Sequence, residues 1–422
     1  MYLIKIIQYA RDDPLYKNSF FLMLNSALTS VLGFIFITIV TRLYTTTDVG
    51  LFSAIVSAAG LLAVFSRLGF DIGLIRFLPE SREPENLINS CFTVSGIVAL
   101  LFAVIFLAGI NFWSPALEFI RGDVKFLFLF IMVTILTVIS GLQMNIFVGR
   151  RSTEYLVVRN IINNLLRFIF AVLFAGVGLL GIFSAHVIGI FLSLFIASFV
   201  LIQKVEPKYF PTPMIKRELI NDIFHYSIGN HAAGILTTGQ ILILPLMVVN
   251  MLGAEDAAYF YVVWAISQII FASHGAIATS FFAEGSNRPE KFYKSARKSL
   301  EFAYLLLIPI AIGVFLLGSK VLLIFGETYS EHATKLLWIF ALSSFPLAFD
   351  EIFINVKRVE KDLKSINFYI GISAISVITF CYLFMIKFGL IGVGFGWLAS
   401  KSIVMLIIIS TMLARRFYCL RH

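Results

Sequence analysis

The chain has 422 residues, of which 59% are hydrophobic and 14% are charged, and its formal net charge is +9. Soluble proteins average about 25% charged and about 45–50% apolar residues. This composition, with a mean hydropathy of +0.93, therefore excludes a soluble domain and predicts an all-α polytopic membrane protein.

The apolar runs, taken in chain order, predict twelve membrane-spanning helices. Residues 1–17 lack the long apolar core and cleavage site of a signal peptide and are expected to form a cytoplasmic segment. Each following run is close to the about 20 residues that a span requires, and a lipid-exposed backbone must be helical. The predicted spans are 18–41, 49–76, 88–110, 125–147, 155–177, 180–202, 225–250, 257–282, 300–325, 333–355, 364–386 and 389–413.

Lys and Arg residues fall mostly on one side of this arrangement. An even number of spans places both termini on the same side of the membrane. If that side is the cytoplasm, the inside segments hold 23 Lys and Arg residues and the outside segments hold 6. This bias follows the positive-inside rule and predicts a cell-membrane protein with cytoplasmic N- and C-termini. It also accounts for the isoelectric point near 9.4 without a nucleic-acid partner.

The longest polar break follows the sixth span and predicts a duplicated architecture. Six spans before and after the break would give two six-helix bundles related as a parallel repeat. Weak internal similarity supports this, since Asp48 aligns with Asp256 and residues 82–86 resemble residues 287–291. The predicted parts are a segment 1–17, a bundle 18–202, a linker 203–224, a bundle 225–413 and a basic tail 414–422.

The end of span two carries three charged residues, Arg67, Asp71 and Arg76, in an apolar helix. Inserting each charge costs about 2.5–3.5 kcal/mol at the centre of the membrane. In a continuous helix Arg67 and Asp71 share a face at i, i+4 and can pair. Gly69 and Gly73 form a small-xxx-small seam that favours close helix packing. Arg76 is placed to reach the cytoplasmic interface, so Arg67 is the candidate for a polar cavity.

Span five contains a polar stripe that runs along one helix face. Its members are spaced i, i+1, i+4, i+5 and i+8, while the opposite face is apolar. Such a stripe predicts a wet cavity; the alternative is that the span starts later and the stripe lies among lipid headgroups. The stripe comprises Arg159, Asn160, Asn163, Asn164 and Arg167.

The second half offers further ionisable residues within its spans. Lys401 lies mid-span, where snorkelling to the interface is difficult, and indicates a cavity or an ion pair. Asp350 and Glu351 could pair with Lys401 or Arg167, or bind a coupling cation. His231 is either a packing residue that makes hydrogen bonds or a proton carrier.

The path lined by these residues carries an excess of positive charge, to which Arg42 at the outer end of span one adds. Arg binds phosphate in a bidentate manner, so the pattern predicts an anionic cargo. No P-loop, metal-ligand spacing or Cys pair occurs, which predicts a protein that is not an enzyme and has no metal or other cofactor, and leaves Na⁺ and H⁺ open as coupling ions. The predicted substrate-binding residues are Arg42, Arg67, Arg159, Asn163, Arg167 and Lys401, and the predicted coupling or ion-pair residues are Asp71, His231, Asp350 and Glu351.

Three stretches resemble one transporter family. T-R-L-Y-T-T-T-D-V-G-L-F-S (41–53) resembles the joint between the first two spans of polysaccharide flippases, and R-L-G-F-D-I-G-L-I-R-F-L-P-E (67–80) the end of their second span. I-F-G-E-T-Y-S-E-H-A-T-K-L-L-W-I-F-A-L-S-S-F-P (324–346) resembles the loop before their tenth span. These are the O-antigen, Wzx-type flippases of the multidrug/oligosaccharidyl-lipid/polysaccharide (MOP) exporter superfamily.

The resemblance implies a V-shaped pair of six-helix bundles, similar to MATE and MurJ transporters. It further implies alternating access for a polyprenyl-diphosphate-linked oligosaccharide, with membrane lipids and glycan polymerase or assembly proteins as partners. Two positions depart from the family pattern: Gln240 stands where many relatives have an Asp, and Tyr44 where they have a Gly. The alternative functions are a cation-coupled multidrug antiporter of the same fold and a membrane glycosyltransferase or ligase, although the latter requires a larger outer domain than these short loops supply.

Overall fold

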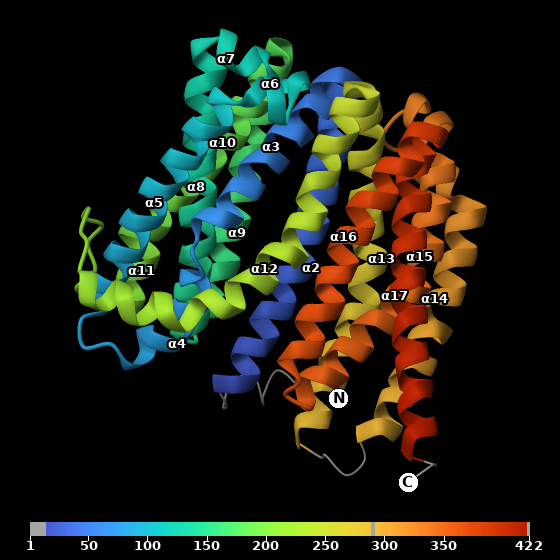
Figure 1. The fold of residues 1–422 in the computed structure, drawn as a ribbon. Helices are drawn as coiled ribbons and strands as arrows, with labels where there is room; N and C mark the ends of the chain where they lie inside the picture. Colours follow the sequence, from blue (N-terminus) through green and yellow to red (C-terminus); the bar gives the residue numbers. More distant parts are fainter. Residues whose placement is uncertain (1–13, 288–291, 420–422) are drawn as a thin grey trace, which may run out of the picture. The chain divides into compact units, whose positions relative to one another are not determined.

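A computed structural model describes residues 14–287 and 292–419 of the chain, and all regular structure in these ranges is helical (Figure 1). Residues 1–13 of the predicted N-terminal segment and residues 420–422 of the predicted basic tail lie outside the described residues. Twelve of the described helices are long and apolar enough to cross a membrane, which confirms the twelve predicted spans.

The long helices are α2 (Pro14–Leu43), α3 (Thr46–Ser66), α5 (Pro84–Ala108), α8 (Val124–Gly149), α9 (Thr153–Leu173), α10 (Leu179–Ile196), α12 (Arg217–Leu252), α13 (Ala254–Asn287), α14 (Phe292–Leu323), α15 (Glu327–Val359), α16 (Leu363–Phe388) and α17 (Leu390–Cys419). The short elements are α4 (Phe70–Phe77), η1 (Leu78–Glu80), α6 (Ile110–Trp113), η2 (Pro115–Leu117), α7 (Phe119–Gly122), η3 (Ala175–Val177), η4 (Ala197–Leu201) and α11 (Ile202–Val205).

The chain divides into two compact units, Met1–Leu242 (unit 1) and Ile243–His422 (unit 2). The division falls inside α12, whereas the sequence suggests a linker at 203–224. In unit 1, α9 packs on α2 and α10, and α8 packs on α3, α4, α5 and α10. In unit 2, α15 packs on α13, α14 and α17, and α16 packs on α17.

The predicted second span, 49–76, is not one continuous helix. Helix α3 ends at Ser66 and α4 begins at Phe70, and between them Leu68 and Gly69 have φ values of 53° and 80°. Positive φ costs little for glycine, so Gly69 allows the chain to turn here. The expectation that Arg67 and Asp71 share a continuous helix face is therefore wrong.

The predicted glycine seam is nevertheless a site of very close packing, with the first half of α12 as its partner. A Cβ atom added at Gly69 would lie 2.7 Å from Cβ of Ser227. At Gly73 it would lie 2.9 Å from Oγ of Ser227 and closer still to Ile223. Because no side chain fits in this gap, α12 rests directly on the backbone of α4, which explains why its first half belongs to unit 1.

The segment between α11 and α12 is fastened to α5 by side-chain hydrogen bonds. Asn89 Nδ2 donates to the carbonyl oxygen of Phe210 (2.9 Å), and the hydroxyl of Thr93 accepts from the backbone N–H of Met214 (3.0 Å). The side chain of Tyr209 is fully buried beside them. The predicted linker is thus an ordered strap across unit 1.

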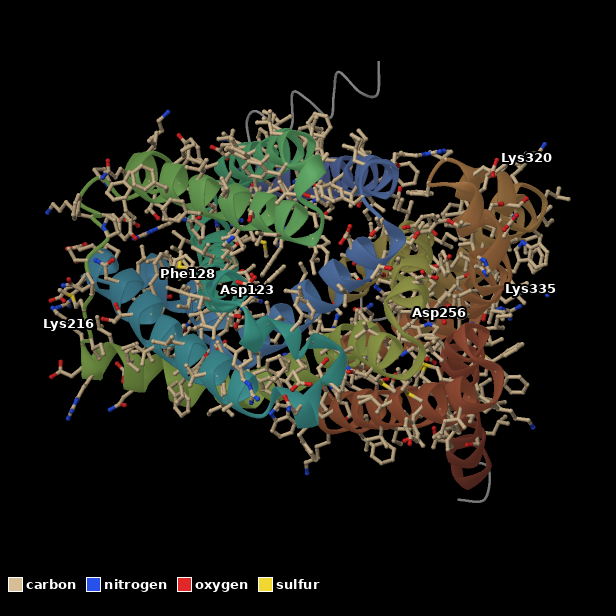
Figure 2. All side chains as sticks on the ribbon, turned by 90° about the horizontal axis from the view of Figure 1, so that it is seen from above. Asp123, Phe128, Lys216, Asp256, Lys320 and Lys335 are labelled. Carbon is tan, nitrogen blue, oxygen red and sulfur yellow. The ribbon has the colours of Figure 1, made fainter. Side chains whose placement is uncertain are left out.

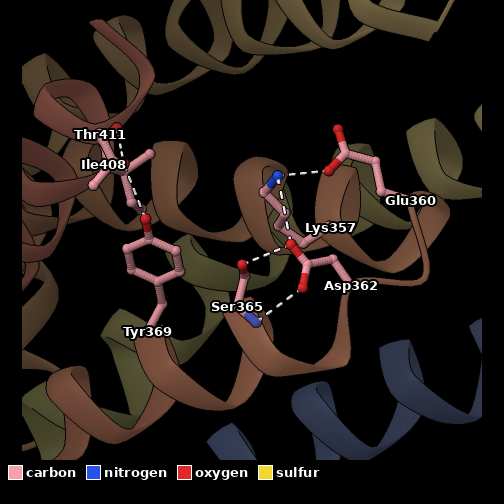
Figure 3. Close-up of polar contacts among 7 residues, drawn as sticks. All are labelled: Lys357, Glu360, Asp362, Ser365, Tyr369, Ile408 and Thr411. Carbon is pink, nitrogen blue, oxygen red and sulfur yellow. Dashed lines mark hydrogen bonds and ion pairs between the residues drawn. The ribbon is translucent and has the colours of Figure 1, made fainter. Parts of the chain in front are cut away.

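A polar cluster joins α15 to α16 in unit 2 (Figure 3). Lys357 Nζ lies 2.5 Å from Glu360 Oε2 and 3.9 Å from Asp362 Oδ2. Asp362 also caps α16, because its carboxylate accepts from the backbone N–H of Ser365 at 3.1 Å and from its hydroxyl at 2.6 Å. This cap satisfies N–H groups that the helix itself leaves unpaired.

Candidate functional site

The polar stripe of α9 is tied to two neighbouring helices. Arg159 is only 4% exposed, and its guanidinium donates to the hydroxyl of Ser140 on α8 and to Oδ1 of Asn160 (3.1 Å). Asn160 in turn donates to Oδ1 of Asn25 on α2 (2.7 Å). These bonds use neutral partners, so they hold the Arg159 charge in position without neutralising it.

Arg67 approaches the same part of α8 from the break between α3 and α4. A Cβ atom added at Gly141 would lie 2.5 Å from Cζ of Arg67, so the guanidinium lies directly on the backbone of α8. Its buried Nε makes no hydrogen bond within the described residues. The structure thus brings Arg67 and Arg159 to consecutive residues of one helix, although they lie far apart in the sequence.

Arg167 lies two turns further along α9. Its guanidinium carbon lies 3.8 Å from the ring centroid of Phe36 on α2, which is the geometry of a cation–π contact. It also donates to Oδ1 of Asn164 (3.3 Å). Oδ1 of the neighbouring Asn163 is buried and accepts no hydrogen bond from the described chain. The stripe therefore offers both cationic and neutral polar groups.

The remaining predicted residues of the first two spans make separate contacts or are exposed. Asp71 Oδ1 accepts from the backbone N–H of Ile72 (3.0 Å), and no Arg67–Asp71 ion pair is present among the described residues, although the two charges interact electrostatically. Arg76 pairs with Glu80 (3.0 Å) on the exposed surface. Arg42, in the last turn of α2, is likewise exposed.

His231 lies on α12 beside the break in span two. It contacts the backbone of Phe65 and interacts electrostatically with Arg67 and Asp71. Gln240 is 7% exposed and donates to the carbonyl oxygen of Thr237 (3.3 Å). Both side chains belong to unit 1.

Unit 2 contains a second buried charge cluster, centred on Lys401. Nζ of Lys401 donates to the hydroxyl of Ser373 (2.6 Å) and lies 4.5 Å from the ring centroid of Trp397. Asp350 and Glu351 on α15 interact electrostatically with it. Asp350 is 7% exposed, and its buried Oδ1 has no hydrogen-bond partner in the described part of the unit. The predicted association of Lys401 with the two acids is thus electrostatic.

Sequence reasoning did not place His274 at this site. Its Nδ1 lies 2.7 Å from Oε2 of Glu351, and its side chain is 1% exposed. The two residues lie on α13 and α15, and no periodicity within one helix connects them. Only the packing of these two helices shows that His274 holds one of the candidate coupling acids.

Comparison with known sequences places the chain in a family. Residues 15–282, more than half of the chain, match the family described as polysaccharide biosynthesis protein. The chain belongs to this family. Residues 234–383 also match the MatE family. A membrane protein of Methanocaldococcus jannaschii, itself described as uncharacterized, is 25% identical over 378 residues, which cover 82% of this chain and 73% of that protein.

Solved structures show the same fold. The lipid II flippase MurJ, in an inward closed conformation, matches with a TM-score of 0.71 and 15% identity over 92% of this chain and 87% of its own. A multidrug resistance MATE transporter of the MOP superfamily, in an inward-facing conformation, matches with a TM-score of 0.65 and 14% identity over 90% of this chain and 92% of its own. The family member described here is therefore a multi-pass membrane protein that shares its fold with these flippases and transporters.

Proposed function

We propose that this chain moves a polyprenyl-diphosphate-linked oligosaccharide, the repeat unit of a surface polysaccharide, from the inner to the outer leaflet by alternating access. The family description concerns polysaccharide biosynthesis, and MurJ is named as a flippase of lipid II. Both support a lipid-linked precursor of a glycan as the cargo.

Arg159 carries the proposal. It is almost completely buried, its hydrogen-bond partners are a Ser and an Asn, and no carboxylate lies within 4 Å among the described residues. A buried charge without a counter-ion costs several kcal/mol. An anionic ligand would offset that cost, and a diphosphate accepts charge-assisted, bidentate hydrogen bonds from guanidinium groups.

The other polar residues take roles that follow from this arrangement. Arg67 and Arg167 would share the diphosphate with Arg159, while Asn163 would bind sugar hydroxyls. Lys401 and Arg42 would supply further positive charge to the cargo. The coupling ion would be Na⁺ or H⁺, with Asp71, His231, Asp350 and Glu351 as the groups that bind or respond to it.

The proposed setting is the cell membrane with both termini in the cytoplasm. Membrane lipids would surround the prenyl tail, and glycan polymerase or assembly proteins would receive the transported unit. No nucleic acid takes part.

A deletion strain without a redundant exporter tests the proposal. Loss of the protein should cause lipid-linked oligosaccharide to accumulate on the inner leaflet and should abolish the surface glycan. Wild-type protein and Arg159→Lys, which keeps the charge, should restore more glycan than Arg159→Gln. The control is Arg121→Gln, because Arg121 is an exposed arginine outside the polar stripe. Normal surface glycan in the deletion strain would refute the proposal.

The second candidate function is a cation-coupled multidrug antiporter. The match of residues 234–383 to the MatE family and the acids Asp350 and Glu351 favour it. It predicts ion-dependent efflux of organic cations from proteoliposomes that contain the purified protein. Efflux of such cations without any movement of lipid-linked oligosaccharide would replace the flippase proposal.

A further inference from the structure

A cavity of about 710 Å³ lies in unit 1, apart from the cationic stripe. It is open on one side and is lined by η1, the turn that follows it, the start of α5 and the first turns of α12. Figure 2 shows Lys216, one of its lining residues, at the edge of the molecule beside the start of α12. Its volume falls in the range of about 300–1,000 Å³ that is typical of small-molecule sites.

The walls of the cavity combine apolar side chains with four charged groups that have no partner. Arg82, Arg217, Glu218 and Asp222 line it, and none of them makes an ion pair or side-chain hydrogen bond with any described residue. Their oppositely charged groups are therefore more than 4 Å apart. Two guanidinium groups and two carboxylates thus remain available to a ligand that carries both signs of charge.

The other charged residues that line the cavity are already paired, which shows that the four residues are a distinct set. Lys216 forms an ion pair with Glu83, and Arg76 pairs with Glu80. The hydrogen bonds from Lys216 and from Asn86 hold the pKa of Glu83 below its usual value. These pairs border the cavity, whose other four charged residues are exposed and have no ion-pair partner among the described residues.

The position of the cavity indicates a lipid rather than a solute. The candidate span of α5 begins at Pro84, directly after the lining residue Glu83, so the cavity lies at the end of that apolar helix, at the depth of lipid headgroups. Ile215 and Tyr226, on either side of it in sequence, are 52% and 46% exposed. The ring of Tyr226 contacts that of Phe77, a lining residue, at 5.3 Å. Exposed apolar side chains beside charged ones are typical of a helix that lies in the membrane interface.

We propose that this cavity binds the headgroup of a zwitterionic phospholipid with a primary ammonium group, such as phosphatidylethanolamine. The phosphate contacts Arg82 and Arg217, and the ammonium donates to Glu218 and Asp222. The first turn of α12 lines the cavity, so its N–H groups would also donate to this phosphate. The acyl chains leave the cavity past Phe77 and Leu219.

Headgroup chemistry excludes the other common phospholipids from this arrangement. A choline group has no N–H to donate to the carboxylates, and its preferred site is a cage of aromatic rings, of which the lining offers Phe77 alone. An anionic headgroup without an ammonium would satisfy the two arginines but would leave Glu218 and Asp222 unpaired beside a negative charge.

Lipid binding to the purified full-length protein tests the proposal. Native mass spectrometry would give the apparent affinity for phosphatidylethanolamine, phosphatidylcholine and phosphatidylglycerol with identical acyl chains. The wild-type protein should favour phosphatidylethanolamine over phosphatidylcholine by about three- to tenfold. This ratio corresponds to the combined free energy of two exposed ionic contacts. The double variant Glu218→Gln/Asp222→Asn should lose this preference, and Arg82→Gln/Arg217→Gln should weaken the binding of all three lipids.

Matched controls and a soluble competitor make the test specific. Glu85→Gln and Lys208→Gln each remove a charge at a residue near the cavity in sequence but outside its lining, and both should keep the preference. Equal affinity of the wild-type protein for phosphatidylethanolamine and phosphatidylcholine would overturn the proposal, whether or not the variants fold. It would also be overturned if the acidic double variant kept the preference, or if soluble phosphoethanolamine bound as tightly as the lipid, which would assign the cavity to a free solute.

Discussion

Arg67 and Arg159 contact α8 at two consecutive residues, Gly141 and Ser140. One arginine comes from the break between α3 and α4, and the other from the polar stripe of α9. Both contacts depend on small side chains in α8, because a larger residue at either position would occupy the space of a guanidinium group. Helix α8 therefore sets the spacing of two cations, of which Arg159 is buried, and this spacing is the feature that a diphosphate could recognise.

Gly141→Ala should reduce transport about ten- to hundredfold while the protein still folds. The added Cβ would lie 2.5 Å from Cζ of Arg67 and would displace the guanidinium. Loss of a hydrogen bond to a charged group costs about 1.5–3 kcal/mol, which gives this range. The measurement is restoration of surface glycan at equal expression. Gly96→Ala is the control, because a Cβ there meets nothing within 4 Å; equal activity of the two variants would show that the Arg67 position is unimportant.

Gly73→Ala should destabilise unit 1 by about 1–3 kcal/mol through overpacking against α12. Removing most of the Ile223 side chain should relieve the larger part of that strain, because an added Cβ at Gly73 would lie an ordinary 3.5 Å from Cβ of Ile223 and only its 2.9 Å approach to Oγ of Ser227 would remain. The double variant Gly73→Ala/Ile223→Ala should therefore be more stable than the sum of the two single effects predicts.

Denaturant or thermal unfolding of the purified protein measures this coupling. Gly371→Ala, at a helical glycine with open space around it, is the control and should be neutral or slightly stabilising. Strict additivity of Gly73→Ala and Ile223→Ala would contradict the close packing of α4 on α12.

Lys401→Met should destabilise unit 2 by about 3–5 kcal/mol, because it leaves the buried Asp350 without its cation. A second change, Asp350→Asn, should recover much of this loss by removing the unpaired charge. The double-mutant cycle is measured by unfolding. As a control, the effects of Lys401→Met and of Asp123→Asn, which lies in the other unit, on the free energy of unfolding should be additive. If the effects of Lys401→Met and Asp350→Asn were also additive, the two groups would not interact.

Asn89→Ala should expose the strap between α11 and α12 to proteolysis. The Asn89 side chain donates to the carbonyl of Phe210 and to the hydroxyl of Thr212 (3.0 Å), and their loss should raise the open fraction of the strap about 5- to 30-fold. Trypsin cleavage after Lys208 reports the opening. Asn111→Ala removes a similar bond, to the exposed Glu118, and should not change this cleavage. No difference between the two variants would mean that Asn89 does not hold the strap.

Hydropathy was sufficient to predict the twelve spans, because each apolar run must form its own helix in lipid. The close approach at Gly69 and Gly73 was also visible, since two small residues one turn apart leave room for another helix. The break at Leu68 and Gly69 was not, because the apolar pattern continues through it without a proline. Consequently the Arg67–Asp71 pair was predicted on a helix face that does not exist.

The candidate site, like the fold, could be predicted from the sequence only in part. The stripe from Arg159 to Arg167 follows from helical period alone. The contacts with Ser140, Gly141 and Phe36 come from other helices, so no pattern within one helix could indicate them. The same holds for His274 and Glu351, which meet only because α13 packs on α15.

Transbilayer movement of a lipid-linked oligosaccharide by the purified protein in proteoliposomes tests the central claim most directly. The substrate carries a fluorescent sugar, and a membrane-impermeant quencher reports the fraction in the outer leaflet. The account predicts rapid movement with the wild-type protein and Arg121→Gln, and movement at least about tenfold slower with Arg159→Gln. Movement at the wild-type rate with Arg159→Gln, or none with the wild-type protein under any Na⁺ or H⁺ gradient, would contradict it.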